Sequence, residues 1–163
     1  MLAVPPQYDA WMELALAEAR AALDTGDVPV GAVVLGADGT VLGRGRNARE
    51  ARQDPTAHAE VEALRQASVA TGDWQLTDAT LVVTLEPCAM CAGAILSARV
   101  PTVVFGAWDE KAGAAGSVYD LLRDRRLPQS AEVYAGVRAE ESAALLSAFF
   151  EDRRFEDRRS LPR

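Results

Sequence analysis

The chain has 163 residues, one histidine, two cysteines and a formal net charge of −7. This length suits a single domain, and two cysteines three positions apart exclude a disulfide-rich scaffold. No apolar run reaches the roughly 18 residues of a membrane span and the N-terminus does not resemble a secretion signal, so we expect a cytoplasmic protein without a membrane segment.

The first half of the chain predicts two helices and a β-hairpin. Apolar residues at helical spacing predict the helices, and alternating or continuous runs of apolar residues predict the strands. Ala37-Asp38-Gly39 is a hairpin signal, so the two runs beside it pair antiparallel. Pro55 suits a first helical turn and predicts the start of the second helix. We expect helices at 8–23 and about 57–70, and strands at 30–35 and 40–45.

The second half continues the alternation of strands and helices. We expect strands at 79–85, 101–106 and 132–135, helices at 86–98, 119–123 and 139–155, and a glycine-rich loop at 109–117. Strands interleaved with helices of this length predict an α/β fold with three layers, α/β/α, and a mixed central sheet of about five strands. We expect one domain over residues 1–163, with its core at about 8–155 and a frayed basic tail at 156–163.

The single histidine and both cysteines of the chain lie in two short segments. The histidine lies in Thr56-Ala57-His58-Ala59-Glu60, and both cysteines lie in Glu86-Pro87-Cys88-Ala89-Met90-Cys91. Cys88 and Cys91 share one face of a helix and can bind one metal ion, and His58 supplies a third ligand. Sulfur and imidazole ligands favour zinc. The alternatives are a packed or surface histidine and a redox-active, structural or chance Cys-x-x-Cys pair.

The number of ligands points to a catalytic site. Structural zinc usually takes four nitrogen or sulfur ligands, and this chain offers three. The fourth position is then left for a water, whose pKa zinc lowers to roughly 7. Glu60 is the candidate acid and base that moves protons between this water and the substrate.

The two segments resemble the zinc nucleobase deaminases, whose signature is His-x-Glu followed by Pro-Cys-x-x-Cys. Further similarity, from about Trp11 to Arg154, identifies the chain as a member of the bacterial tRNA-specific adenosine deaminase family, in the cytidine-deaminase-like superfamily. The residues that carry it beyond the zinc motifs are Asp27-Val28-Pro29-Val30-Gly31-Ala32, Asn47, Val104-Phe105-Gly106-Ala107, Asp109, Lys111, Gly113-Ala114-Ala115-Gly116-Ser117, and Phe149-Phe150 with Arg153-Arg154.

The resemblance implies a reaction and a set of contacts. The reaction is hydrolytic deamination of adenosine to inosine at the wobble position of a tRNA anticodon loop, with one Zn²⁺ per subunit held by His58, Cys88 and Cys91. Glu60 is the proton shuttle, and the family forms homodimers. The substrate contacts that it implies are Val30, Asn47, Ala59, Asp109, Phe149, Arg153 and Arg154.

Several of these residues have structural alternatives. Asn47 also suits a turn after the second strand, and Asp109 a solvated loop. Trp108 stands where family members often carry a basic residue; its indole stacks on a base or packs against the protein. The arginines from Arg158 onward suit a solvated helix end.

The acidic total does not exclude RNA, because the charge is segregated. Between residues 44 and 52, around Asn47, there are four arginines and only one acidic residue, Glu50. The C-terminal segment is also basic, while the first helix is acidic. Arginine contacts with phosphate would make binding depend on salt. Two alternatives remain: a deaminase of a free base or nucleoside, of the guanine or cytosine type, and a zinc-stabilised RNA-binding module or inactive subunit.

Overall fold

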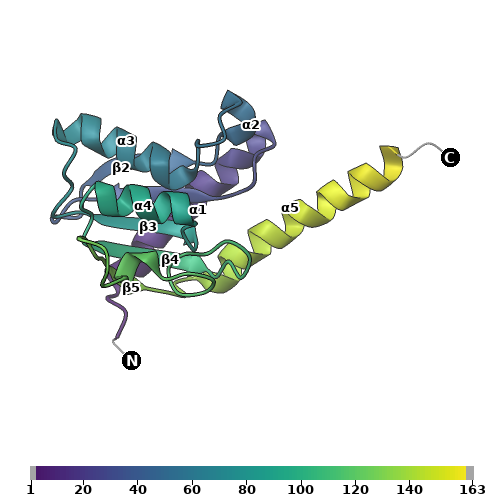
Figure 1. Cartoon of the computed structure of the whole chain (residues 1–163). Coiled ribbons are helices and arrows are strands. Elements are labelled where there is room, and N and C mark those ends of the chain that lie inside the picture. The colour runs from purple at the N-terminus through teal and green to yellow at the C-terminus, as the bar shows by residue number, and fades with distance from the viewer. Residues whose placement is uncertain (1–2, 161–163) are drawn as a thin grey trace.

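The computed structural model describes residues 3–160 and contains a mixed sheet between two layers of helices (Figure 1). Its strands are β1 (Gly31–Leu35), β2 (Val41–Arg46), β3 (Thr80–Leu85), β4 (Thr102–Ala107) and β5 (Glu132–Tyr134). They lie in the order β2-β1-β3-β4-β5. β1 is antiparallel to β2 and β3, whereas β4 is parallel to β3 and β5. The predicted mixed sheet of five strands and the hairpin are confirmed.

The helices cover both faces of this sheet. They are α1 (Gln7–Ala22), α2 (Arg49–Arg52), α3 (Ala59–Thr71), α4 (Ala89–Ser97) and α5 (Ala139–Ser160), with short 3₁₀ turns η1 (Leu23–Thr25) and η2 (Leu121–Arg123). α3 and α4 pack on one face, and α1 and the first part of α5 pack on the other. The three-layer prediction is confirmed. None of the helices within residues 3–160 is long and apolar enough to cross a membrane.

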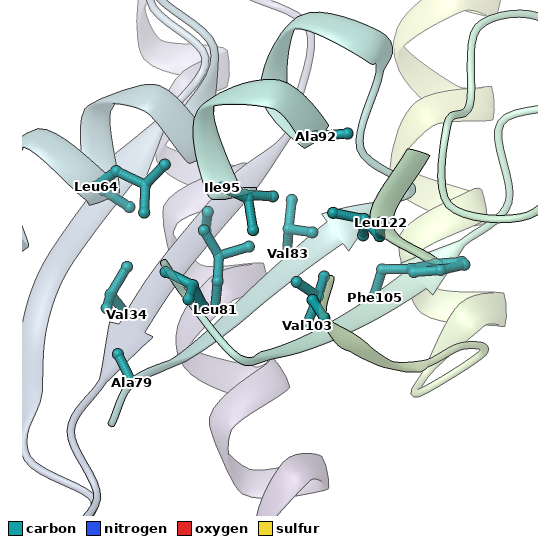
Figure 2. Close-up of a cluster of buried hydrophobic side chains, with 14 of the residues drawn as sticks. Val34, Leu64, Ala79, Leu81, Val83, Ala92, Ile95, Val103, Phe105 and Leu122 are labelled. Carbon is teal, nitrogen blue, oxygen red and sulfur yellow. The ribbon is translucent and has the colours of Figure 1, made fainter. Parts of the chain in front are cut away.

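Alternation along the strands supplies the two apolar faces. On β3, Leu81 and Val83 point toward α4, while Val82 points toward α1. Figure 2 shows the first cluster, in which Ile95 lies over Val83. Each fully buried aliphatic side chain of this size contributes about 1.5–3 kcal/mol. The strands that lead into the candidate site are therefore held from both sides.

One glycine sets how closely α3 approaches the sheet. Gly45 on β2 lies under the first turn of α3, and a Cβ atom there would lie 2.1 Å from the Ala59 carbonyl oxygen. No residue with a side chain fits that contact. The start of α3, and with it His58 and Glu60, is therefore fixed directly against the edge strand.

Several elements differ from the sequence prediction. α4 begins at Ala89 rather than at 86, because Cys88 still has an extended backbone conformation, and the helix expected at 119–123 is the 3₁₀ turn η2. The sequence pattern does not predict α2. α3 begins at Ala59 rather than about 57 because Pro55 lies in a turn, in which the Asp54 carbonyl accepts the Ala57 N–H. α5 continues past 155 through Ser160, and residues 161–163 of the expected tail lie outside the described residues. Beyond its first turns α5 leaves the sheet and extends into solvent (Figure 1).

Candidate active site

Two helix starts meet at the candidate site. His58 immediately precedes α3 and Cys88 immediately precedes α4, both in extended backbone conformation. Neither side chain bonds to the free N–H groups of its own helix, although many residues at this position do. Both are therefore available to a shared ligand. The positive ends of the two helices also favour thiolate at Cys88.

His58, Cys88 and Cys91 form a compact cluster. The Nδ1 atom of His58 lies 3.6 Å from Cys88 Sγ and 3.5 Å from Cys91 Sγ. The three ligand atoms all lie within 4.8 Å of one another. Zinc at about 2.3 Å from sulfur and about 2.05 Å from nitrogen, with tetrahedral angles, requires a nitrogen–sulfur separation of about 3.6 Å. The cluster therefore has the spacing of a tetrahedral zinc site.

The protonation of the cluster suits a cation. A hydrogen bond from the Cys91 thiol lowers the pKa of Cys88 to about 4, so Cys88 is a thiolate at neutral pH. The hydrogen bond with Cys88 raises the pKa of His58. The same hydrogen bond between the two cysteines, with burial, raises the pKa of Cys91, which therefore keeps its proton until a metal ion displaces it.

Glu60 lies beside this cluster but outside it. It is in the first turn of α3 and is 4% exposed. Burial raises the pKa of Glu60 to about 7. A carboxyl group that titrates near neutral pH can both accept and return a proton, as general acid–base catalysis requires.

A pocket of about 240 Å³ opens over these residues. Its walls bring together four of the predicted substrate contacts, Val30, Asn47, Ala59 and Asp109, with Glu60 and two members of the metal cluster, His58 and Cys88. The full lining is Val28, Val30, Asn47, Arg49, His58, Ala59, Glu60, Leu85, Glu86, Cys88, Asp109 and Ala112.

Asn47 shapes one wall of this pocket. Its Nδ2 donates to the Val28 carbonyl at 3.2 Å, and its Oδ1 accepts the Arg49 N–H at 3.2 Å. Asn47 therefore does turn the chain after β2. A carboxamide has a second N–H and a second lone pair, so the turn does not exhaust its capacity to bind a ligand.

Trp108 and Asp109 lie at the start of the glycine-rich loop, and Asp109 lines the pocket. Asp109 Oδ1 accepts the N–H groups of Lys111 and Ala112, at 3.0 and 3.1 Å. The Trp108 ring packs edge-on against Phe105 with centroids 4.8 Å apart, yet the residue is 49% exposed. Trp108 thus packs on the protein and presents its other half to solvent.

The three predicted contacts on α5 lie apart from the pocket. Arg153 donates to the Gly26 carbonyl at 3.2 Å and lies over the ring of Phe149. Arg154 donates to the Phe150 carbonyl at 3.2 Å. Both arginines border a separate groove of about 590 Å³, whose lining includes Lys111. Lys111 follows Asp109 by two residues, so this groove begins beside the pocket.

Five pocket residues were not predicted as site residues. They are Val28, Arg49, Leu85, Glu86 and Ala112. Each is within three residues of a predicted site residue. Including the sequence neighbours of the predicted residues would therefore have found all five. Glu86 belongs to the motif segment itself, but nothing in its position there indicates what it binds.

Comparison with known proteins gives consistent matches. Residues 7–152 match the family model of MafB19-like deaminases. A tRNA-specific adenosine deaminase of Bacillus subtilis (strain 168) is 46% identical over 148 residues, 91% of each chain. A solved structure from a study of A-to-I editing by tRNA:A34 deaminases at the wobble position of transfer RNA is 43% identical, with a TM-score of 0.80 over 84% of this chain and 99% of the other. A guanine deaminase structure from Bacillus subtilis is 32% identical, with a TM-score of 0.61 over 93% and 95% of the two chains.

Proposed function

Because this chain belongs to the tRNA-specific adenosine deaminase family and is a deaminase, we propose that it converts adenosine to inosine at the wobble position of a tRNA anticodon loop. The observation that carries the proposal is the cluster of His58, Cys88 and Cys91 beside the buried Glu60, under a pocket of about 240 Å³. Pockets for drug-sized ligands hold roughly 300–1,000 Å³. The smaller volume here suits one base taken out of its stack.

The donor set of the site fits one Zn²⁺ per chain. His58, Cys88 and Cys91 would hold it, since one imidazole nitrogen and two thiolates at this spacing are zinc ligands. When bound, zinc supplies a water that gives up its proton near neutral pH.

The residues of the chain account for the proton transfers. In the overall reaction water adds oxygen to C6 of adenine, the bond from C6 to the amino nitrogen breaks, and ammonia leaves. Glu60, buried beside the metal cluster, takes the proton of the attacking water and returns it to the base. Val30 and Ala59 line the base pocket, and Asn47 and Asp109 contact the target nucleotide and its neighbour.

The RNA is a stem-loop rather than a duplex, since a base inside a duplex cannot reach the pocket. Arg153 and Arg154 of α5 contact the loop or its phosphates along the groove that begins at Lys111. Phe149, whose ring lies against the Arg153 guanidinium, is the third contact proposed on this helix. A tRNA substrate also places the protein in the cytoplasm.

The protein acts as a homodimer, a proposal that the outer face of α3 and α4 supports. Val69 is 84% exposed, Trp74 58% and Met90 39%. Val69 and Trp74 border an apolar depression between the two helices. Light scattering on the wild type and on Val69→Glu with Trp74→Ser tests this: a dimer that dissociates in the double variant supports the interface, and an unchanged mass contradicts it.

The decisive assay compares substrates. Purified protein with zinc is given a tRNA anticodon stem-loop with adenosine at the wobble position and, separately, adenosine, cytosine and guanine. Inosine in the stem-loop alone supports the proposal. Turnover of guanine alone would establish the second candidate, which the likeness to the Bacillus subtilis guanine deaminase favours. Zinc without turnover of any substrate would identify a binding module.

A further inference from the structure

A buried carboxylate that the proposed reaction does not use holds the loop at the pocket. Glu86 is 2% exposed. Its Oε2 accepts the Asp109 N–H at 2.9 Å, and its Oε1 accepts the N–H groups of Ala115 and Ser117, each at 3.0 Å. Among the residues that the structure describes, no ion pair involves Glu86. Three main-chain N–H groups of one loop are its partners.

These three hydrogen bonds join distant parts of the chain. Hydrogen bonds to a charged acceptor are about twice as strong as neutral ones, and a buried carboxylate without them would be very unfavourable. The glutamate and the loop therefore require each other. Both ends of the loop are attached, because Oε2 holds Asp109 at its start while Oε1 holds Ala115 and Ser117 at its end.

Two further contacts show how closely the loop fits. A Cβ atom on Gly113 would lie 2.2 Å from Glu86 Oε2, so the carboxylate occupies the space that any other residue at 113 would need. The Ala114 N–H donates to the Pro87 carbonyl at 2.7 Å. The loop thus lies against the segment that leads into Cys88.

We propose that Glu86 is a positioning residue for the substrate, which holds the loop 109–117 so that Asp109 and Ala112 form the wall of the pocket. It acts through the main chain of Asp109, and both oxygens of its carboxylate accept hydrogen bonds from the loop. The inference rests on the proposed function to the extent that the pocket receives a nucleotide. It predicts that removal of these hydrogen bonds weakens substrate binding more than it slows the chemical step.

Glu86→Gln is the sharpest variant. Both carboxylate oxygens face N–H donors, so an amide must turn its NH₂ group toward either Asp109 or the Ala115 and Ser117 pair, where donor meets donor. One end of the loop is released in either orientation. Glu132→Gln, on the exposed Glu132 of β5, is the matched control for the chemical change.

We expect Glu86→Gln to raise KM for the anticodon stem-loop about tenfold while kcat changes less than threefold and zinc stays at one per chain. Amide hydrogen exchange should speed up at least tenfold in residues 109–117 and stay unchanged in α3 and α4. Glu86→Asp, which keeps two acceptor oxygens, should recover part of the KM. Glu132→Gln should behave as the wild type.

Other outcomes overturn the proposal. An equal loss of kcat and zinc would make Glu86 a support of the metal site, and faster loop exchange with an unchanged KM would separate the loop from substrate binding. If Glu86→Gln does not fold, exchange in the wild type decides: Ala115 and Ser117 N–H must be protected, and fast exchange there contradicts the proposal. If the wild type deaminates guanine instead of the stem-loop, the proposed function fails, but the same KM and exchange measurements still test Glu86.

Discussion

The starts of α3 and α4 and the outer half of α5 are opposite kinds of structure. At the helix starts, His58, Cys88, Cys91 and Glu60 are buried or half-buried against the sheet. Along α5, every residue from Glu151 to Arg159 is exposed, and the helix extends away from the body (Figure 1). The first region is fixed before a substrate arrives. The second presents its side chains to solvent.

This difference suggests a division of labour. Chemistry needs groups held within fractions of an ångström, which burial provides. Affinity for RNA comes largely from phosphate contacts, which exposed arginines provide. We therefore expect variants at the helix starts to change kcat and variants on α5 to change KM.

Glu60→Gln should give the largest effect of the variants that keep zinc and is the strictest test of the first region. We expect kcat to fall about 10²–10⁴-fold, because general acid–base catalysis contributes this much, while KM for the stem-loop changes little. Zinc content, measured by atomic emission, should stay at one per chain, since Glu60 lies outside the ligand cluster.

Cys91→Ser is the contrasting variant. It should lose zinc and activity together if the Cys91 thiolate is one of the three proposed zinc ligands, as its distance of 3.5 Å from His58 Nδ1 suits. If Glu60→Gln also loses zinc, Glu60 supports the metal site and the division between ligands and proton shuttle is wrong.

The double variant Arg153→Ala with Arg154→Ala tests the second region. We expect KM for the stem-loop to rise about tenfold or more with kcat unchanged. The slope of log KM against log salt should fall by about 1 for each phosphate that the variant no longer binds. Kinetics at several salt concentrations measure both. A fall in kcat instead would mean that α5 acts on the pocket rather than on the RNA.

The two regions also differ in how well the sequence predicted them. His-x-Glu and Pro-Cys-x-x-Cys are local patterns, and local patterns placed His58 and Cys88 at helix starts to within a few residues. The alternation of strands and helices predicted the sheet for the same reason. The role of Glu86 could not be predicted because its partners lie 23–31 positions away and are main-chain N–H groups, which carry no side-chain signal.

The errors in the elements have physical causes as well. α2 has four residues, Arg49–Arg52, which is too short for a helical pattern to appear. The predicted end of α5 at 155 is wrong because Glu156-Asp157-Arg158-Arg159 contains no glycine or proline to end a helix. The resemblance implied contacts on α5, but a pattern could not say that they would lie outside the pocket.

Asp27→Asn tests the place where α5 contacts the body of the protein. Asp27 follows Gly26, whose carbonyl accepts a hydrogen bond from Arg153 of α5. The buried Asp27 carboxylate accepts the N–H groups of Glu50 and Ala51 and the hydroxyl of Thr25. An asparagine turns donors toward some of these donors, so we expect a decrease of about 1–2 kcal/mol in the free energy of unfolding at pH 7. Denaturant unfolding measures it.

This decrease should depend on pH in a defined direction. Burial alone raises the pKa of Asp27, but the hydrogen bonds from Thr25, Glu50 and Ala51 outweigh it and leave the pKa below its usual 3.8. The stabilisation is therefore complete above about pH 4 and is lost as pH falls through the lower pKa of the folded state. The wild type and Asp27→Asn should converge in stability in acid. A difference that stays constant from pH 7 to pH 3 would contradict this.

The smallest effect is expected for Arg158→Ala with Arg159→Ala, which matches the charge change of the Arg153 and Arg154 variant one turn further along α5. If RNA contacts end near Arg154, KM should change less than twofold and the salt slope should stay the same, because an exposed charge that touches no phosphate releases no counterion and is weakened by salt. The same kinetic series measures both pairs. A tenfold rise in KM for this pair would mean that the RNA surface reaches the end of the described helix. Equal effects from the two pairs would mean that α5 contributes through its net charge rather than through particular arginines.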